Sequence, residues 1–194
     1  MTDLLIATTN PGKIREIFPI LHGTSVRLLT LADVGGEIPE PEETGASFAQ
    51  NARLKADYYA TKTGLDTVAE DSGWVIDALD GRPGIHSARY PGATYPDKFA
   101  NLYRELAPFP RPWAARYFCA VALVASGRPR FEGSGVVLGE IVPEPRGTGG
   151  FGYDPIFFFP GFNATFGEID EARKLTVAHR GKAFRKLREY LLTR

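Results

Sequence analysis

The chain has 194 residues, a length that predicts a single domain with a sizeable core. Hydrophobic residues make up 43% and charged residues 24%, which is close to the average of globular proteins and excludes disorder, collagen and coiled coil. The 23 Lys and Arg balance the 23 Asp and Glu, so the chain lacks the basic surplus of a general nucleic-acid coat, and we expect no nucleic-acid partner.

The first third of the chain predicts two strands and two helices. The apolar run 3–8 indicates a buried strand. A helix follows, with Asn10 as N-cap, Pro11 at its first position, and an apolar face made of Ile14, Ile17, Phe18 and Leu21. Residues 26–29 predict a second strand, and residues 47–63 predict a helix that ends at Gly64.

The remainder of the chain is richer in strands. Residues 67–69 predict a short strand that leads into Glu-Asp-Ser-Gly at 70–73, with 74–78 extended, 80–96 as loop and 97–106 as helix. Long antiparallel strands at 115–126 and 130–142 are expected around a Gly-Arg-Pro turn. A strand at 157–159 and a last helix follow, with Ala183, Leu187, Tyr190 and Leu191 on one face. This order predicts an α/β domain with a mixed sheet.

One cysteine excludes an internal disulfide framework and a thiolate zinc cluster. Cys119 lies in the apolar run 118–124, which predicts a buried structural thiol. The sequence starts without a basic signal-peptide region, and no apolar stretch approaches the roughly 20 residues that a bilayer span requires. These features predict a cytoplasmic protein without a membrane partner.

Charge is unevenly distributed along the chain. Residues 31–44 contain no Lys or Arg and five acids, namely Asp33, Glu37, Glu40, Glu42 and Glu43. Residues 171–194 contain eight Lys or Arg and two acids, an excess of six positive charges. Each run alone is typical of a solvated face. Together they favour a polyphosphate–metal site, because carboxylates bind the metal and cations bind the phosphates.

Two polar segments follow predicted strands. Thr-Thr-Asn-Pro-Gly-Lys at 8–13 leads into a helix N-terminus, where unpaired N–H groups and the dipole favour an anion and Lys13 adds a charge for phosphate. The P-loop spacing is absent, and a capped helix with a solvent-exposed lysine is the alternative. At 70–73, Glu70 and Asp71 point to opposite sides, so one can bind Mg²⁺ while the other faces elsewhere; a plain turn is the alternative.

Two further segments carry aromatic and basic groups. Residues 147–154 contain Gly-x-Gly-x-x-Gly, but Pro155 and an aromatic strand follow in place of a helix, which argues against a dinucleotide fold. A flexible loop that presents Phe151 for stacking and Asp154 for a base-edge N–H fits better, and a hairpin with a buried Phe is the alternative. Lys174 and the pair His179-Arg180 supply basic groups for a binding site. A basic helix end exposed to solvent is the alternative.

These segments, in this order, resemble the Ham1/RdgB family of inosine/xanthosine triphosphate pyrophosphatases. The resemblance covers nearly the whole chain, and the combined pattern is specific although each piece alone is weak. The matching pieces are 8–13, Glu-Glu-Thr-Gly at 42–45 with Phe48, Asn51 and Lys55, Glu-Asp-Ser-Gly at 70–73, Pro-Gly-Ile-His-Ser-Ala-Arg-Tyr at 83–90, Gly-Thr-Gly-Gly-Phe-Gly-Tyr-Asp-Pro at 147–155, Lys174, and Ala-His-Arg-Gly at 178–181.

The resemblance implies one ITPase-like domain over residues 1–194, with an elongated mixed β-sheet flanked by helices and two lobes around a central nucleotide cleft. It implies hydrolysis of the deaminated purine triphosphates ITP, dITP and XTP to the nucleoside monophosphate and pyrophosphate. It also implies Mg²⁺ as cofactor and a homodimer.

By the same resemblance, Asp71 is the catalytic carboxylate that binds Mg²⁺ and orients or deprotonates the attacking water, and either Glu42 or Glu43 assists the metal. The residues implied to bind substrate are Thr8, Thr9, Asn10, Pro11, Gly12, Lys13, Ser72, Phe151, Gly152, Tyr153, Asp154, Lys174, His179 and Arg180. Thr9, Arg173 and Ala178 depart from the usual family pattern, but none of them removes a catalytic group.

The edge of the base gives a physical reason for selection. A 6-oxopurine presents N1–H as donor and O6 as acceptor, whereas adenine presents the reverse. If Asp154 accepts from N1–H and Arg180 donates to O6, ATP is rejected, because unpaired buried polar groups cost about 1–3 kcal/mol each. Asp154→Ala is then expected to raise KM for ITP and to narrow the ITP/ATP ratio. GTP shares both groups, so its exclusion must lie near its 2-amino group.

Three other functions compete with this interpretation. A dinucleotide-dependent oxidoreductase needs a helix directly after Gly152, which Pro155 opposes. A non-enzymatic nucleotide- or nucleic-acid-binding module would use the basic tail and would release no pyrophosphate. A pyrophosphatase acting on ATP, GTP or pyrimidine triphosphates differs from the favoured enzyme only in its kinetics.

Overall fold

The computed structural model describes residues 2–35 and 38–193, so Glu37 of the acidic run lies outside the described residues. The strands are β1 Thr2–Ile6, β2 Val26–Thr30, β3 Asp66–Ile76, β4 Pro83–Gly84, β5 Trp113–Ala125, β6 Arg128–Ile141, β7 Phe157–Phe159 and β8 Ala164–Thr165. The α-helices are α1 Pro11–Leu21, α2 Phe48–Thr63, α3 Tyr95–Leu106, α4 Glu171–Val177 and α5 His179–Leu192.

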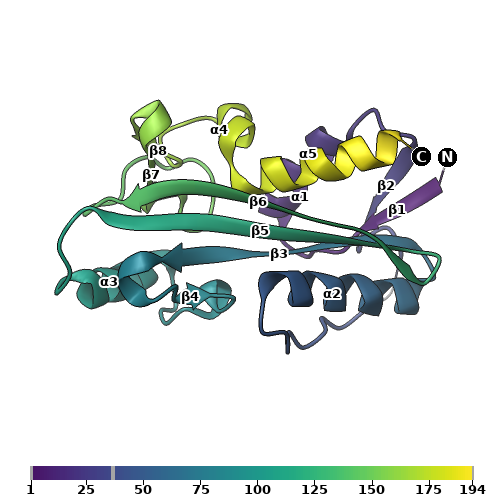
Figure 1. Cartoon of the computed structure of the whole chain (residues 1–194), viewed down its shortest axis with the longest axis horizontal. Helices are drawn as coiled ribbons and strands as arrows, with labels where there is room; N and C mark the ends of the chain where they lie inside the picture. Colours follow the sequence, from purple (N-terminus) through teal and green to yellow (C-terminus); the bar gives the residue numbers. More distant parts are fainter. Residues whose placement is uncertain (1, 36–37, 194) are drawn as a thin grey trace. The chain divides into compact units, whose positions relative to one another are not determined.

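All of these strands belong to one sheet, with the order β2-β1-β3-β5-β6-β7-β8 and with β4 paired to β3 (Figure 1). β1 runs parallel to β2 and to β3, whereas β4 is antiparallel to β3 and β7 is antiparallel to β6 and to β8. The predicted α/β fold with a mixed sheet and flanking helices is therefore confirmed. No helix in the described part of the chain is both long enough and apolar enough to cross a bilayer.

The described residues divide into two compact units. Unit 1 is drawn from Met1–Ser72, Cys119–Gly135 and His179–Arg194, and unit 2 from Gly73–Phe118 and Val136–Ala178. The long strands β3, β5 and β6 each contribute residues to both units. The single domain expected from chain length stays a prediction.

Unit 1 has a three-layer arrangement, with α1 and α5 on one face of its strands and α2 on the other (Figure 1). Leu4 and Ile6 of β1 pack with Ile17 of α1 and Leu187 of α5. Leu5, between them in sequence, is also fully buried, because alternation along the strand turns it to the opposite, α2-covered face. Each position along a unit 1 strand therefore decides which helices its side chain meets.

Unit 2 is built around an aromatic core. The ring centroid of Trp74 lies 5.2 Å from that of Tyr117, 4.9 Å from that of Tyr153 and 5.9 Å from that of Phe157. α3 contributes Phe99, whose ring lies 5.9 Å from that of Tyr153. The core therefore fixes Tyr153 and, with it, the end of the glycine-rich segment that precedes it.

The predicted helix ends are largely confirmed. The Asn10 side chain caps α1, Ser47 caps α2, and Gly64 ends α2 with φ at 70°. Cys119 is fully buried, as its apolar surroundings predicted. α3 begins at Tyr95, two residues earlier than predicted, because Thr94 forms a capping box with Asp97.

Three strand predictions were wrong in detail. β3 is one strand of 11 residues that runs through 70–73, since Trp74 pairs onward with Gly84 of β4. That pairing also places a short strand inside the region predicted as loop. The β5–β6 turn is Ser126-Gly127, with φ at 51° and 68°, so Arg128 already belongs to β6. α4 was not predicted, because its seven residues are too few to show a periodic pattern.

Candidate active site

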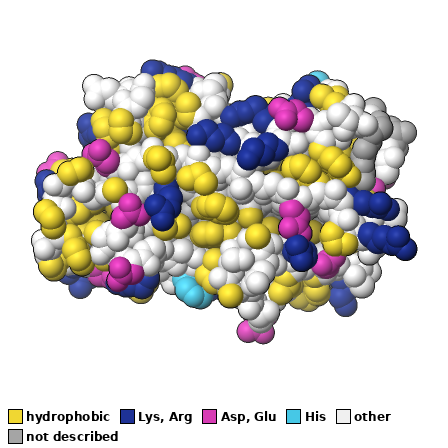
Figure 2. Space-filling view, viewed as in Figure 1, with side chains coloured by type: hydrophobic (Ala, Val, Ile, Leu, Met, Phe, Trp, Pro, Cys, Tyr) yellow, Lys and Arg dark blue, Asp and Glu magenta, His cyan; other side chains and the backbone are white. Residues whose placement is uncertain are grey.

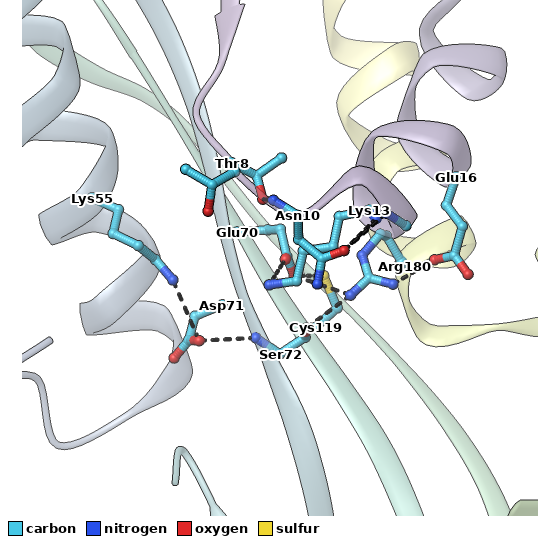
Figure 3. Close-up of polar contacts among 12 residues, drawn as sticks. Thr8, Asn10, Lys13, Glu16, Lys55, Glu70, Asp71, Ser72, Cys119 and Arg180 are labelled. Carbon is cyan, nitrogen blue, oxygen red and sulfur yellow. Dashed lines mark hydrogen bonds and ion pairs between the residues drawn. The ribbon is translucent and has the colours of Figure 1, made fainter. Parts of the chain in front are cut away.

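The acidic pair on β3 lies beyond the end of its parallel neighbour. The β1 register pairs Ile6 with Val68, and the Ala7 N–H donates to the Val68 carbonyl at 2.8 Å. Glu70 and Asp71 follow directly, at the edge where open α/β sheets bind ligands. Alternation sends Asp71 towards α2 and Glu70 towards α1 and α5 (Figure 3). The two carboxylates thus have different surroundings, as the sequence predicted.

Asp71 is held by two residues of α2. The Asn51 side-chain amide donates to Asp71 Oδ2 at 3.0 Å, and the Lys55 ammonium lies 3.5 Å from Asp71 Oδ1. Lys55 also donates to Glu43 Oε1 at 2.6 Å, so the carboxylates of Glu43 and Asp71 share one cation. Asn51 is almost fully buried, which fixes the orientation of the carboxylate it binds.

The pKa values of this group follow from burial and charge. Burial raises the pKa of Asp71, while Lys55 and the Asn51 hydrogen bond oppose that rise. For Lys55, burial acts to lower the pKa, but the charges of Asp71, Glu70 and Glu43 outweigh burial and raise it. A protonated lysine between carboxylates marks this place as one that attracts cations.

Only part of the acidic run 31–44 contacts the group around Asp71 and Lys55. Glu43 is half-buried against Lys55, whereas Glu42 is exposed. Glu40 accepts a hydrogen bond from the Thr9 hydroxyl at 2.6 Å. Within residues 2–35 and 38–193, no three His, Cys, Asp or Glu side chains gather into a group that could hold a metal by themselves.

The loop before α1 differs from the expected anion site. The Asn10 side-chain oxygen accepts from the N–H groups of Gly12 at 2.8 Å and Lys13 at 3.3 Å. The expectation of unpaired amides at this helix end was therefore wrong, since a good N-cap residue bonds to those same donors. The positive charge of Lys13 remains, with its side chain one-fifth exposed.

Glu70 lies in a buried ion network (Figure 3). It pairs with Lys13, lies 3.6 Å from Arg180 Nη2, and accepts a hydrogen bond from the Cys119 thiol at 3.3 Å. Burial alone would raise the pKa of Glu70, but the charges of Lys13, Arg180 and Lys55 hold it well below the ordinary value. Burial, together with Glu70, raises the pKa of the Cys119 thiol, which keeps it protonated.

The Arg180 guanidinium bridges three elements within unit 1. It pairs with Glu16 of α1, and its Nη2 donates to Ser72 Oγ of β3 at 2.9 Å. Sequence reasoning missed Glu16, because a single acidic residue on an otherwise ordinary helix carries no signal of burial. His179, next to Arg180 at the start of α5, is also buried.

Glu70→Gln is expected to make the stability of the protein less sensitive to acid. Because the pKa of Glu70 is lowered on folding, its contribution to stability is present above the ordinary value of 4.5 and is lost as pH falls below it. The difference in unfolding free energy between wild type and E70Q, measured by urea titration, should be large at neutral pH and shrink towards about pH 3. Glu189→Gln, at an exposed position of α5, is the control. A constant difference for E70Q would contradict the expectation.

In unit 2, Asp154 organises the glycine-rich loop. Its Oδ2 accepts from the Lys174 ammonium at 2.5 Å and from the Phe151 N–H at 2.8 Å, and the Tyr117 hydroxyl donates to Oδ1 at 3.4 Å. The side chains of Asp154 and Lys174 are each at most 3% exposed. Lys174 Nζ lies 4.8 Å from the centroid of the Phe151 ring. Aromatic ring, cation and carboxylate therefore form one group.

The glycines of this loop have a local structural reason. Gly150 has φ at 69°, and a Cβ placed there would lie 2.1 Å from Asp154 Oδ2. Gly152 also has a positive φ and precedes Tyr153, a core residue. A single 3₁₀ turn at Asp154–Ile156 and then β7 follow, with no long helix, so the context that a dinucleotide-binding loop requires is absent.

The sequence-predicted residues thus fall into two groups. Unit 1 holds residues 8–13, Glu42, Glu43, Asp71, Ser72, His179 and Arg180. Unit 2 holds residues 151–154 and Lys174. Asn51 and Glu16 are buried partners that the site prediction left out, and of these only Asn51 belongs to a motif that could have signalled it.

Comparison with known proteins shows the family of the chain. A model of the Ham1 family matches residues 4–190. The chain belongs to the Ham1 family. It is 46% identical to the dITP/XTP pyrophosphatase of Geobacter sulfurreducens over 98% of this chain and 97% of that protein. Identity to the Geobacillus kaustophilus dITP/XTP pyrophosphatase is 42%, with 97% and 94% covered.

Solved structures show the same fold for this Ham1 family chain. A HAM1 protein from Coxiella burnetii matches with a TM-score of 0.91 and 35% identity, covering all of both chains. A nucleoside-triphosphatase described as dITP/XTP pyrophosphatase from Mycobacterium abscessus matches with a TM-score of 0.75 and 37% identity, over 96% of this chain and 97% of that one.

The residues of this Ham1 family chain fit a hard divalent cation. Glu43 and Asp71 carry carboxylate oxygens that already converge on one positive charge, the ammonium of Lys55. Mg²⁺ is usually held by one or two carboxylates together with substrate phosphates and water, so a third protein carboxylate is not required. The donor set therefore suits a metal that binds with the substrate.

Proposed function

We propose that this Ham1 family protein hydrolyses the deaminated purine nucleoside triphosphates dITP, ITP and XTP to the monophosphate and pyrophosphate. It is a hydrolase of the acid-anhydride bond. The observation that carries the proposal is the arrangement on β3, where Asp71 shares a cation with Glu43 while the adjacent Glu70 supports Lys13. One carboxylate group suits metal and water, and the neighbouring cation suits phosphate. The curated relatives named dITP/XTP pyrophosphatase support the same reaction.

The reaction follows from these roles. Asp71 orients a water and accepts its proton as the water oxygen attacks the α-phosphorus, and the α–β anhydride bond then breaks to release pyrophosphate. Asn51 and Lys55 hold the Asp71 carboxylate in position. Asp71 and Glu43 would hold Mg²⁺, and the bound ion would neutralise negative charge on the phosphates. Lys13 and Ser72 bind phosphate oxygens.

Base recognition is assigned to unit 2. Phe151 stacks on the base with its ring already contacted by the Lys174 ammonium. We assign to Asp154, whose carboxylate also binds Lys174, the loop backbone and the Tyr117 hydroxyl, the recognition of a base-edge N–H. Gly152 and Tyr153 complete the loop.

We also propose the oligomeric state, metal, cellular location and domain number that the sequence predicts. The protein forms a homodimer, uses Mg²⁺ in preference to other divalent ions, acts in the cytoplasm, and folds as one domain over 1–194. Light scattering of the purified chain and metal titration of its activity test the first two. Limited proteolysis tests the single domain, since such a domain should resist cleavage between the two units.

The test of the function is pyrophosphate release with Mg²⁺ from ITP, XTP, GTP and ATP at equal concentrations. We expect pyrophosphate release from ITP and XTP to be at least about a hundredfold faster than release from GTP and ATP. This ratio corresponds to a difference of about 2.7 kcal/mol in the activation barrier. Equal rates on all four nucleotides would agree with a hydrolase but would contradict selection by the 6-oxo group of the base. Absence of release from folded protein would favour a binding module instead.

A nucleic-acid-binding module is less well supported. Figure 2 shows Lys and Arg gathered at the upper middle of this face with Asp and Glu beside them, and the net charge of the sequence is zero. Two of the basic tail residues, Lys174 and Arg180, are buried in ion pairs and cannot contact a nucleic-acid backbone as a surface patch would.

A further inference from the structure

The Asp154 carboxylate is held through both of its oxygens. Oδ2 accepts from the Lys174 ammonium at 2.5 Å and from the Phe151 N–H at 2.8 Å. Contacts at one oxygen restrain the other oxygen only weakly, because hydrogen bonds tolerate a broad range of angles at the acceptor. The Tyr117 hydroxyl donates to Oδ1 at 3.4 Å and so supplies a second point of attachment.

Tyr117 is a rigid donor. It lies on β5 and is buried in the aromatic core of unit 2. Its ring centroid is 4.7 Å from that of Phe157 and 5.2 Å from that of Trp74. Close packing keeps the ring in place, and a tyrosine side chain has only two rotatable bonds to the ring. The hydroxyl therefore reaches Asp154 from a fixed point of the core.

The Tyr117 hydroxyl keeps its hydrogen. Burial, together with the charge of Asp154, raises the pKa of Tyr117 well above its usual range. Lys174 and the Phe151 N–H are donors to the same carboxylate. Three donors suit an ionised carboxylate, which accepts hydrogen bonds and donates none. Asp154 is therefore presented as an acceptor.

A well-oriented acceptor discriminates between purines. At position 1 of the ring, a 6-oxopurine carries an N–H, which donates, whereas adenine carries a bare nitrogen, which accepts. A carboxylate that faces this position pairs with the 6-oxopurine and is left unpaired opposite adenine. The difference in binding is largest when the acceptor is held in one place, so the orientation of Asp154 bears directly on selectivity.

We propose that Tyr117 is a positioning residue for base selection, whose hydroxyl orients the Asp154 carboxylate and so increases the preference for 6-oxopurine over adenine nucleotides. This inference rests on the proposed function, in which Asp154 recognises a base-edge N–H. Tyr117 acts through Asp154 and not by contact with the base. Its role does not involve the triphosphate, so its loss should change selectivity between bases and leave phosphate binding unchanged.

The kinetic test is Tyr117→Phe, which removes one oxygen atom and keeps the packed ring. We expect the ratio of kcat/KM for ITP to kcat/KM for ATP to fall about threefold to tenfold, the range that one hydrogen bond contributes. Tyr90→Phe is the matched control, since Tyr90 is also buried in unit 2 and donates to the carboxylate of Glu105 at 2.7 Å. Y90F should retain the wild-type ratio. A purely structural role of the Tyr117 hydroxyl would lower stability in both variants and change the ratio in neither.

A double-variant cycle tests whether Tyr117 acts through Asp154. In an Asp154→Ala background the carboxylate is absent, so Tyr117→Phe should cause no further fall in the ITP/ATP ratio. Both values of kcat/KM are measured in one preparation, so that the folded fraction cancels. A further fall as large as that in the wild-type background would mean that the hydroxyl acts by another route, and it would overturn the proposal.

A binding measurement separates this inference from the proposed function, because calorimetry with inosine monophosphate and with inorganic tripolyphosphate needs no catalysis. We expect Y117F to bind inosine monophosphate about threefold to tenfold more weakly than wild type and Y90F do, and all three proteins to bind tripolyphosphate equally. Wild type that binds inosine monophosphate but hydrolyses no nucleotide would overturn the function alone. Wild type that hydrolyses ITP and ATP equally well would overturn both the selectivity and the role of Tyr117. An unchanged ITP/ATP ratio in Y117F beside a selective wild type, or equal affinity of the two proteins for inosine monophosphate, would overturn the role of Tyr117 alone.

Discussion

Asp71→Asn is expected to keep the fold and to lower kcat for ITP at least about a hundredfold, a loss of about 2.7 kcal/mol in transition-state stabilisation. An asparagine has the shape of Asp71 but cannot accept a proton from water and binds a divalent ion weakly. It also brings an amide group towards the donors of Asn51 and Lys55, which now bind a carboxylate. Metal binding and water orientation therefore fail together.

The measurement is pyrophosphate release from ITP at saturating Mg²⁺, with circular dichroism and thermal unfolding to confirm the fold. Asp57→Asn, at an exposed position of α2 that lies two residues after Lys55 and so on a different side of the helix, makes the same chemical change away from the site and should retain wild-type turnover. Near-normal kcat for D71N in folded protein would contradict the catalytic role of Asp71. Glu43 and Glu70 would then be the next carboxylates to test.

The second large effect is expected at Asp154. Asp154→Ala leaves the Lys174 ammonium buried without its carboxylate, and breaking a buried pair in this way costs about 3–5 kcal/mol. It also removes the acceptor for the Phe151 N–H, so the loop loses its anchor. We expect the unfolding free energy from urea titration to fall by about this amount.

The double variant Asp154→Ala with Lys174→Met is the control for that prediction. Because it removes both charges, it should recover a substantial part of the lost stability, whereas a sum of two independent losses would contradict the paired role. The selectivity of D154A needs a measure that folding does not distort. The ratio of kcat/KM for ITP to kcat/KM for ATP, measured in one preparation, is such a measure, because the folded fraction cancels. An unchanged ratio would refute base recognition by Asp154.

Local sequence patterns were sufficient for much of the fold. Asn10 and Pro11 place the start of α1, and Gly64 ends α2, because capping and positive φ depend on residues adjacent in the chain. The alternation along β3 separated Glu70 from Asp71 for the same reason. Boundaries failed where pairing with another strand decided the outcome, as in the continuation of β3 through 70–73 to its contact with β4.

The site divides in a similar way. The sequence by itself determined the chemical groups, namely the carboxylates on β3, Lys13, the aromatic loop residue Phe151 and the family to which they belong, since residue type and spacing are properties of one chain. Only the tertiary structure decided the partners: Glu43 rather than Glu42 beside Lys55, Glu16 buried against Arg180, and Lys174 neutralised by Asp154. Burial and charge pairing depend on contacts between elements far apart in sequence, and for Glu16 and Arg180 the separation is 164 residues. No pattern within a helix or a strand carries that information, because the energy of a buried charge is set by the element packed against it.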